Sequence, residues 1–177
     1  IEGLTPEEAA RVAGEVADLG VESVAICLLH SYRFPEHELA LGEAIRALIP
    51  GVHVSLSHAV VGTFREFERA ATTELDAALS PLLAGYLERL ARRAGEEGLP
   101  EPEIMQSSGG VAGLDAVAAH AAVAVLSGPA GGAAAAALIA RQSGEQNLLC
   151  FDMGGTSCDV CAIEDGRIHD TSSKKIA

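Results

Sequence analysis

The sequence predicts an α/β fold with a sheet of mixed strand direction. Apolar segments of strand length alternate with segments of helical periodicity along most of the chain, which is typical of strands joined by helices. The C-terminal part ends in closely spaced strand-like segments, which adds antiparallel pairs. Of the 177 residues, 49% are hydrophobic and 21% are charged, and these values are typical of a domain with a packed core.

The first elements are a capped helix and a buried strand. Thr5-Pro6-Glu7-Glu8 is a capping box with proline at the first helical position, and apolar residues follow at helical spacing up to Gly20. Residues 21–29 form a nearly unbroken apolar run, as expected for a parallel strand covered on both faces. The chain is then expected to turn over residues 30–35.

The next segment predicts a helix, a strand and a long helical stretch. A helix over 36–48 ends before Pro50-Gly51, and residues 52–56 alternate as a strand. Helical spacing then extends over 63–94. We expect Ser80-Pro81 to divide this stretch by capping a new helix.

The following segment is expected to keep the alternating order. Residues 103–107 predict a short strand that ends in a tight turn at Ser108-Gly109-Gly110. A helix over 114–121 and a buried strand over 123–126 come next. The alanine-rich segment 130–141 has high helix propensity once past Gly131-Gly132.

Three strands are predicted near the C-terminus. They cover residues 148–151, 157–163 and 167–171, and Asp165-Gly166 supplies a hairpin turn between the last two.

The charge of the chain excludes several partners. Twelve basic and 25 acidic residues give a net charge of -13, which repels nucleic acids and anionic membrane surfaces. The most apolar run, 111–126, is interrupted by Asp115 and His120, so no membrane span is expected. The four cysteines lie in strand-like surroundings, which favours reduced thiols and a cytoplasmic protein. Since the chain starts at Ile1 without a leader, we expect a fragment of a longer protein.

The segment 148–163, LLCFDMGGTSCDVCAI, carries the pattern that is most informative for function. An apolar strand runs into Asp152 and then Gly154-Gly155-Thr156, where bare backbone lets N–H groups approach phosphate oxygens and a hydroxyl adds a donor. Asp152 is placed to hold a hydrated Mg²⁺, and Asp159 points either to the same place or to solvent. The alternative is an ordinary glycine hairpin whose aspartate caps backbone amides.

Three other patterns give weaker hypotheses. Cys158-x-x-Cys161 has redox or zinc spacing, but residues three apart in a strand point to opposite faces, so buried free thiols are favoured. Four histidines in the first 60 residues have no metal-binding spacing and are expected at the surface or in hydrogen bonds. The charged run at 65–69 predicts either a solvated helix face or the lining of a cleft or subunit contact.

Several blocks in order resemble the hydantoinase A/5-oxoprolinase family of the actin, Hsp70 and sugar-kinase superfamily of ATPases. FDMGGTSCDV is similar to its second phosphate motif, and SGPAGG at 127–132 to a further glycine-rich segment. IMQSSGGV at 104–111, AICLLHSYRFPEHE at 25–38 and the helix at 63–80 with FREFERAATT match further family blocks. The family usually has threonine where Cys158 stands, which we expect to tune the loop without abolishing its function.

The resemblance implies a ribonuclease-H-like, actin-like ATPase fold: a mixed sheet with flanking helices, present here as an incomplete fragment. Residues 1–143 would be the later part of the first domain with a crossing helix from Gly131 to Arg141, and residues 144–177 the opening hairpins of the second. ATP and Mg²⁺ are the implied cofactors. The implied nucleotide-binding residues are Gly131, Gly132, Gly154, Gly155 and Thr156, and Asp152 is the catalytic, metal-holding residue.

The activity that this resemblance implies is ATP-dependent hydrolysis of a cyclic amide such as a hydantoin or 5-oxoproline. The expected partners are the small-molecule cyclic amide and the rest of the same chain or a hydantoinase B-type subunit. Because the first phosphate motif and the adenosine-side loop lie outside the 177 residues, the isolated fragment is expected to be inactive. The alternatives are the ATP-using subunit of an acetone-carboxylase-like enzyme and a nucleotide-sensing or assembly module without turnover.

Overall fold

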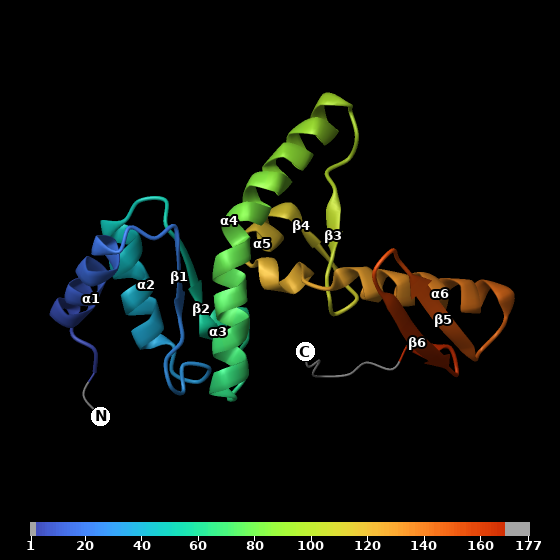
Figure 1. Ribbon diagram of the computed structural model, residues 1–177, viewed down its shortest axis with the longest axis horizontal. Helices are drawn as coiled ribbons and strands as arrows, with labels where there is room; N and C mark the ends of the chain where they lie inside the picture. The colour runs from blue at the N-terminus through green and yellow to red at the C-terminus, as the bar shows by residue number, and fades with distance from the viewer. Residues whose placement is uncertain (1–2, 169–177) are drawn as a thin grey trace. The chain divides into compact units, whose positions relative to one another are not determined.

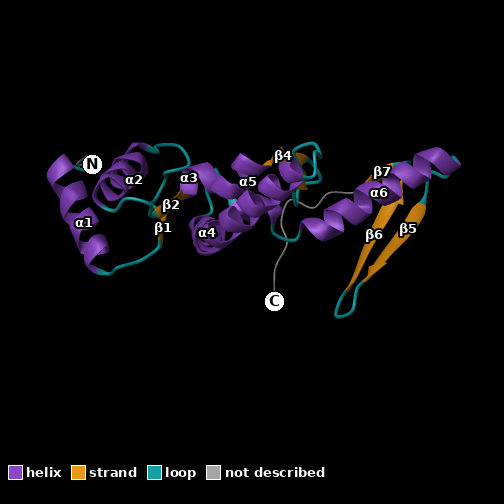
Figure 2. Cartoon of the chain, turned by 90° about the horizontal axis from the view of Figure 1, so that it is seen from above, coloured by secondary structure: helices purple, strands orange, loops and turns teal. Residues whose placement is uncertain are grey.

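A computed structural model describes residues 3–168 and confirms a mixed α/β architecture (Figure 1, Figure 2). The chain divides into two compact units. Unit 1 comprises residues 1–104 and 113–122, and unit 2 comprises residues 105–112 and 123–177. Among the described residues the strands form three separate sheets of two, two and three strands, where the alternating pattern predicted one.

Unit 1 begins with a capped helix and a parallel pair of strands. Helix α1 (Pro6–Asp18) has the predicted capping box, in which Thr5 Oγ1 accepts from the N–H of Glu8 and the N–H of Thr5 donates to the Glu8 carboxylate. Strand β1 (Ser23–Ile26) is shorter than the predicted run and pairs in parallel with β2 (His53–Leu56). The prediction that the apolar run at 21–29 contains a strand of a parallel sheet is therefore confirmed.

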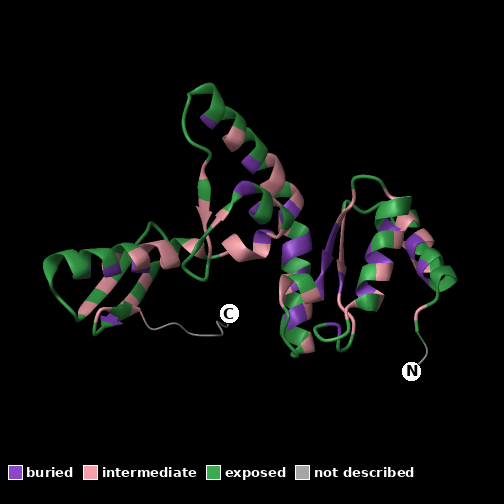
Figure 3. Ribbon diagram, turned by 180° about the vertical axis from the view of Figure 1, so that it is seen from behind, coloured by how far each residue is buried: buried purple, intermediate pink, exposed green. Residues whose placement is uncertain are grey.

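Helix α2 (Glu36–Leu48) lies at its predicted position and packs on this pair of strands. Its buried Leu41 and Ile45 join a core that also contains Ala9, Ala13, Ile26, Val54 and Leu56. A short helix, α3 (Ser57–Val60), follows β2 directly and was not predicted. In Figure 3 buried segments, drawn in purple, occur on the strands and helices of unit 1.

Helix α4 (Glu66–Glu96) is continuous through Pro81, so the predicted division at Ser80-Pro81 is wrong. The hydroxyl of Ser80 does not cap a new helix: it is buried and accepts from the N–H of Ala121. An interior proline removes one helical hydrogen bond and bends the axis, and α4 changes direction along its length in Figure 1.

A strand pair and a short helix follow α4. Strands β3 (Glu103–Met105) and β4 (Val111–Gly113) flank the predicted glycine turn, in which Gly109 has a φ of 90°. Strand β4 was not predicted. Helix α5 (Leu114–Ala119) confirms the helix expected there.

The predicted strand over residues 123–126 is wrong, because Ala121–Ala124 form a 3₁₀ turn. Side chains of α4 bind the backbone just before this segment: Ser80 accepts from the N–H of Ala121, and the buried Asp76 accepts from the N–H of Ala122 at 2.9 Å. Alanine also has a low preference for strands.

Unit 2 contains helix α6 (Ser127–Ser143) and a three-stranded antiparallel sheet of β5 (Leu148–Met153), β6 (Cys158–Glu164) and β7 (Arg167–Ile168). The helix starts before Gly131, so the SGPAGG segment forms its first turns. A stripe of buried alanines on α6, at positions 133, 137 and 140, accompanies the buried Ile163 of β6. Most other positions of this unit are exposed or half-buried (Figure 3).

Asp165 and Gly166 both have positive φ and form the predicted turn between β6 and β7. Residues 169–171 of the last predicted strand lie outside the described residues. Among the described helices, none is both long and apolar enough to cross a bilayer.

Candidate functional site

The β5–β6 hairpin holds the residues that the sequence singled out. Its four-residue loop, 154–157, is closed by a hydrogen bond of 2.9 Å from the N–H of Gly154 to the carbonyl of Ser157. In the described structure, neither the N–H of Gly155 nor the N–H and hydroxyl of Thr156 forms a hydrogen bond. The loop therefore presents free donors at Gly155 and Thr156, whereas the N–H of Gly154 is used within the turn.

Two carboxylates face each other next to this loop. Asp152 of β5 and Asp159 of β6 are direct cross-strand partners, so their side chains project from the same face with Cβ atoms about 5 Å apart. Like charges at such positions destabilise a sheet. Within the described residues no hydrogen bond or ion pair compensates either carboxylate. The structure thus places Asp159 beside Asp152, which the sequence alone left open.

Helix α6 approaches this carboxylate pair through a glycine. A Cβ built on Gly132 would lie 3.2 Å from Oδ2 of Asp152, so a larger residue there would displace the carboxylate. Gly131, its neighbour, instead faces Met105, with a Cβ-to-Cγ distance of 3.8 Å. Of the two helix glycines predicted for the site, the structure brings Gly132 to Asp152.

The opposite face of the hairpin is apolar and exposed. Side chains alternate along each strand, so the residues next to Asp152 and Asp159 in the sequence project from the face opposite these acids. Phe151 is 62% exposed and Met153 is 78% exposed. The same face includes Leu149, Cys158, Val160 and Ala162.

The donor chemistry of Asp152 and Asp159 fits a hydrated Mg²⁺. Magnesium takes one or two carboxylates and keeps several waters, so two adjacent aspartates with no other partner suffice. No group of three or more histidine, cysteine or acidic side chains that could hold a metal occurs among residues 3–168. A closed, all-protein metal cage is therefore not formed there.

The cysteines do not form the redox or zinc site that their spacing suggested as an alternative. All four are free, and Cys158 and Cys161 lie on opposite faces of β6. Cys161 instead faces Cys150 across the strands. Burial raises the pKa of Cys161, and the neighbouring Cys150 thiol raises it further, so this thiol stays protonated at neutral pH. Cys158 is exposed, so the expectation of buried thiols is wrong for this residue.

The histidines of the first 60 residues do not converge on a metal. The Nε2 of His53 bonds Ser55 at 3.0 Å, and Nε2 of His37 accepts from the N–H of Leu4. Burial lowers the pKa of His53, against the opposing charge of Asp76. His58 belongs to a separate cluster in unit 1 that the sequence did not reveal.

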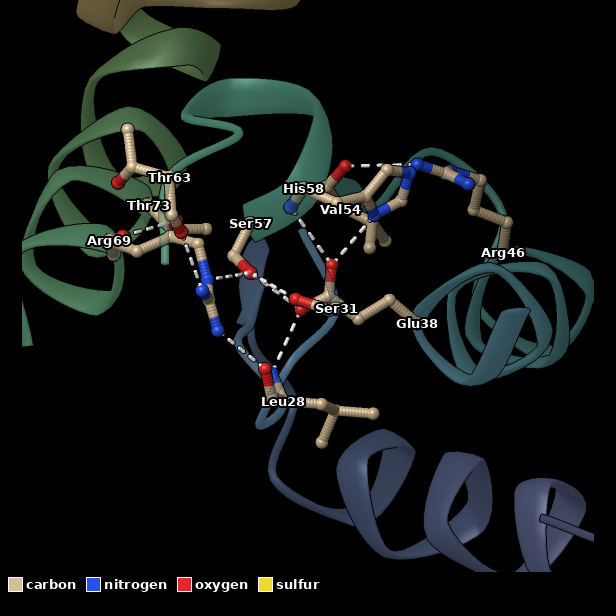
Figure 4. A network of polar contacts seen from close by, with 10 residues as sticks. All are labelled: Leu28, Ser31, Glu38, Arg46, Val54, Ser57, His58, Thr63, Arg69 and Thr73. Atoms are coloured by element: carbon tan, nitrogen blue, oxygen red, sulfur yellow. Dashed lines mark hydrogen bonds and ion pairs between the residues drawn. The ribbon is translucent and has the colours of Figure 1, made fainter. Parts of the chain in front are cut away.

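That cluster centres on Glu38, whose side chain is fully buried (Figure 4). One carboxylate oxygen accepts from the N–H of Leu28 at 2.8 Å and from the Ser57 hydroxyl at 2.6 Å. The other accepts from the N–H of His58 at 3.1 Å and from its Nδ1 at 2.7 Å. Burial by itself would raise the pKa of Glu38, but these hydrogen bonds outweigh it and lower the pKa, so the carboxylate is ionised at neutral pH.

Arg69 supplies the positive charge of the same cluster, and its side chain is also fully buried. Its guanidinium donates to the Leu28 carbonyl at 2.6 Å, the Thr63 carbonyl at 2.7 Å and the Ser57 hydroxyl at 3.0 Å (Figure 4). The charged run at 65–69 is therefore split: Arg65 and Glu68 are exposed, and Arg69 joins α4 to α3 and to the segment that follows β1. A signal for this was present in the sequence, because an arginine that falls on the buried stripe of a helix needs polar partners.

The sequence also matches known protein families. The family described as hydantoinase/oxoprolinase matches residues 69–177, and the hydantoinase/oxoprolinase N-terminal region matches residues 1–49. This chain belongs to the hydantoinase/oxoprolinase family. It is 37% identical over 150 residues to the caprolactamase subunit alpha of Pseudomonas jessenii, a match that covers 84% of this chain and 22% of that protein. It is likewise 37% identical over 151 residues to the 5-oxoprolinase of Saccharomyces cerevisiae, which covers 85% of this chain and 12% of the yeast protein.

Two solved structures resemble the chain. An ATP-dependent caprolactamase from Pseudomonas jessenii superposes with a TM-score of 0.78 at 34% identity, covering 88% of this chain and 23% of that one. A nucleotide-free acetone carboxylase, from work on ATP-dependent acetone carboxylation, superposes with a TM-score of 0.74 at 29% identity, covering 90% and 23%. This hydantoinase/oxoprolinase family member thus spans less than a quarter of the length of each of these proteins.

Proposed function

We propose that this chain carries the phosphate-binding part of an ATP-dependent enzyme that hydrolyses a cyclic amide. The observation that carries the proposal is the β5–β6 hairpin: two adjacent acids, free donors at Gly155 and Thr156, and the close approach of Gly132 of α6. Relatives named 5-oxoprolinase and caprolactamase, and a structural neighbour described as ATP-dependent, support a cyclic amide as the substrate class.

In this proposal the fold is the ribonuclease-H-like, actin-like ATPase fold, with α6 as the crossing helix and a domain boundary near residue 143. Thr156 and the backbone of Gly154 and Gly155 line the phosphate groups of ATP, and Gly131 and Gly132 keep α6 close to them. Such bare backbone suits phosphate oxygens because no side chain blocks their approach. The remaining parts of the nucleotide site, and any hydantoinase B-type partner subunit, lie beyond the 177 residues.

Asp152 and Asp159 are the residues that would hold Mg²⁺, which neutralises phosphate charge during phosphoryl transfer. Phosphoryl transfer from ATP to the amide oxygen breaks the bond to ADP and makes the amide carbon a better electrophile. The chain's own contribution is to position the phosphates and to place negative charge where the ion is needed, since phosphoryl transfer requires mainly positioning and charge neutralisation.

Replacing Asp152 with alanine in the longest natural chain that carries this sequence, with its partner subunit if there is one, tests the proposal. We expect amide-dependent ATP turnover to fall by about 100-fold or more, as for the loss of one charge-stabilising group, with the circular dichroism spectrum unchanged. Glu145→Ala, an exposed acid of the same unit, is the matched control. Turnover that survives Asp152→Ala would refute the assignment.

A second candidate is the ATP-using subunit of a ketone carboxylase. It is favoured by the acetone carboxylase likeness and by 28% identity over 165 residues to the acetophenone carboxylase gamma subunit of Aromatoleum aromaticum, covering 90% of this chain and 22% of that subunit. Product analysis separates the two, since one reaction yields a ring-opened acid and the other a carboxylated ketone. Nucleotide that is bound and never hydrolysed would instead indicate a sensing or assembly module.

A further inference from the structure

Two cysteines that the proposed function does not use face each other across the β5–β6 hairpin. Cys150 and Cys161 are direct partners in the antiparallel register, so both side chains project from one face of the sheet. Both are free and half-buried, and the two thiols are close enough to interact. The same face carries Asp152 and Asp159 nearer the loop, and helix α6 packs on it.

The backbone already holds these two cysteines at the separation that a disulfide needs. Directly opposite residues of an antiparallel pair have Cα atoms about 4.5–5.5 Å apart, and disulfides join residues whose Cα atoms are about 4.4–6.8 Å apart. A disulfide also requires side chains that do not point apart, and a shared face meets this condition. Cys158, the third cysteine of the hairpin, lies opposite Met153 and projects from the other face, so it has no such partner.

We propose that Cys150 and Cys161 are an oxidisable dithiol, which a low-molecular-weight disulfide such as oxidised glutathione converts into a cross-strand disulfide. The thiolate of one cysteine attacks a sulfur of oxidised glutathione, and one glutathione leaves. The thiolate of the other cysteine then attacks the protein sulfur of this mixed disulfide, and the second glutathione leaves. Two protein thiols are thus oxidised, one oxidised glutathione is reduced, and the two thiol protons pass to the two glutathione molecules.

The new bond would close a ring over residues 150–161, which carry both acids and the whole glycine loop. The reduced hairpin opens when β5 and β6 separate, and a covalent bond between the strands removes most of the open conformations. We therefore expect hydrogen exchange of the hairpin amides to slow by about 10-fold or more on oxidation. The amides of α1, which belongs to unit 1, should exchange at an unchanged rate.

The test uses the longest natural chain that carries this sequence, with its partner subunit if there is one. The reduced protein is incubated with equal amounts of reduced and oxidised glutathione. Because the thiol of Cys161 stays protonated at neutral pH, the exchange is slow, and the mixture is followed until its composition is constant. Free thiols are then blocked with N-ethylmaleimide. The measurement needs no ATP turnover, so it is independent of the proposed function.

The sequence allows the three cysteines of the hairpin to be separated. A protease that cleaves before aspartate cuts at Asp152 and Asp159, which leaves each cysteine on a different peptide. After digestion without reductant, we expect mass spectrometry to show the peptide of Cys150 linked to that of Cys161 in most molecules. The peptide of Cys158 should carry N-ethylmaleimide or a single glutathione.

Two serine variants complete the test. Cys161→Ser removes one of the two sulfurs and should abolish the linked peptides. Cys158→Ser is the matched control, because it removes a thiol of the same strand on the opposite face and should leave the linked fraction unchanged.

Three results would overturn the proposal. The first is a wild type in which Cys150 and Cys161 both still react with N-ethylmaleimide after equilibration, and this result decides even if Cys161→Ser does not fold. The second is a disulfide from either of them to Cys158. The third is a linked hairpin whose amides exchange as fast as before, because a bond formed within the folded hairpin must restrict its opening.

Discussion

Replacing the buried Glu38 with glutamine removes one charge while keeping the shape of the side chain. The wild-type carboxylate accepts four hydrogen bonds, two on each oxygen. Glutamine keeps one acceptor oxygen, which can still serve Leu28 and Ser57, but its NH₂ group is a donor. That group would face two further donors, the N–H and Nδ1 of His58.

The loss of these hydrogen bonds sets the cost of the substitution. The imidazole can change tautomer so that Nδ1 accepts, but the backbone N–H of His58 is left without an acceptor at a cost of about 1–3 kcal/mol. The two remaining bonds lose their charge-assisted character, which weakens each by about 1 kcal/mol. Relief from burying a charge offsets part of this. We expect the free energy of unfolding to fall by about 3 kcal/mol at pH 7.

Urea denaturation followed by far-ultraviolet circular dichroism measures the change, since the chain has no tryptophan. Glu36→Gln, an exposed acid on the same helix, is the control. Burial raises the pKa of Glu38, but its hydrogen bonds outweigh this and hold the pKa below its usual range. The stabilisation that ionised Glu38 gives the folded state is therefore complete above the pKa that this carboxyl has in the unfolded chain. It is lost as the pH falls through the pKa of the same carboxyl in the folded state.

The difference between wild type and Glu38→Gln should thus be largest near neutral pH and should narrow as the pH is lowered toward 3. A variant as stable as the wild type at pH 7 would refute the reasoning. So would a difference that stays constant down to pH 3, because it would show that the charge of Glu38 contributes nothing.

Two further substitutions test the hairpin and the long helix. Gly132→Ala should stabilise α6 by up to about 1 kcal/mol, but ATP turnover should fall because the added Cβ would lie 3.2 Å from Oδ2 of Asp152. Gly128→Ala is the control, since a Cβ at Gly128 has nothing within 4 Å. Equal turnover in both variants would contradict the role of Asp152. Pro81→Ala restores an N–H that can donate to the Ala77 carbonyl, so the free energy of unfolding should rise by about 1–3 kcal/mol in urea titrations. An unchanged urea midpoint would show that the proline in α4 costs no stability.

Local signals in the sequence predicted many elements correctly. The capping box at Thr5, the helix over 36–48 and the Asp165-Gly166 turn depend on neighbouring residues, and all three are present. Elements decided by distant contacts were missed. Residues 123–126 look like a buried strand, but Asp76, far away in the sequence, takes a backbone donor of the segment just before them and favours a 3₁₀ turn.

The candidate site shows the same limit. The glycine loop and Asp152 were predicted from the local pattern, whereas the pairing of Asp152 with Asp159 follows from the strand register and so needed the structure. The cluster of Glu38, His58 and Arg69 was missed because its members come from three helices separated in the chain. Spacing within one element cannot reveal that they meet.

The alternation of the β5–β6 hairpin limits how this part of the gene can change. Most single substitutions on either face leave the remaining side chains where they are. Deleting or adding one codon between residues 148 and 153 is different, because it would exchange the two faces of β5 and move Phe151 or Met153 to the place of the acid. Among natural variants, length differences should therefore fall in the linker after α6 and spare this strand.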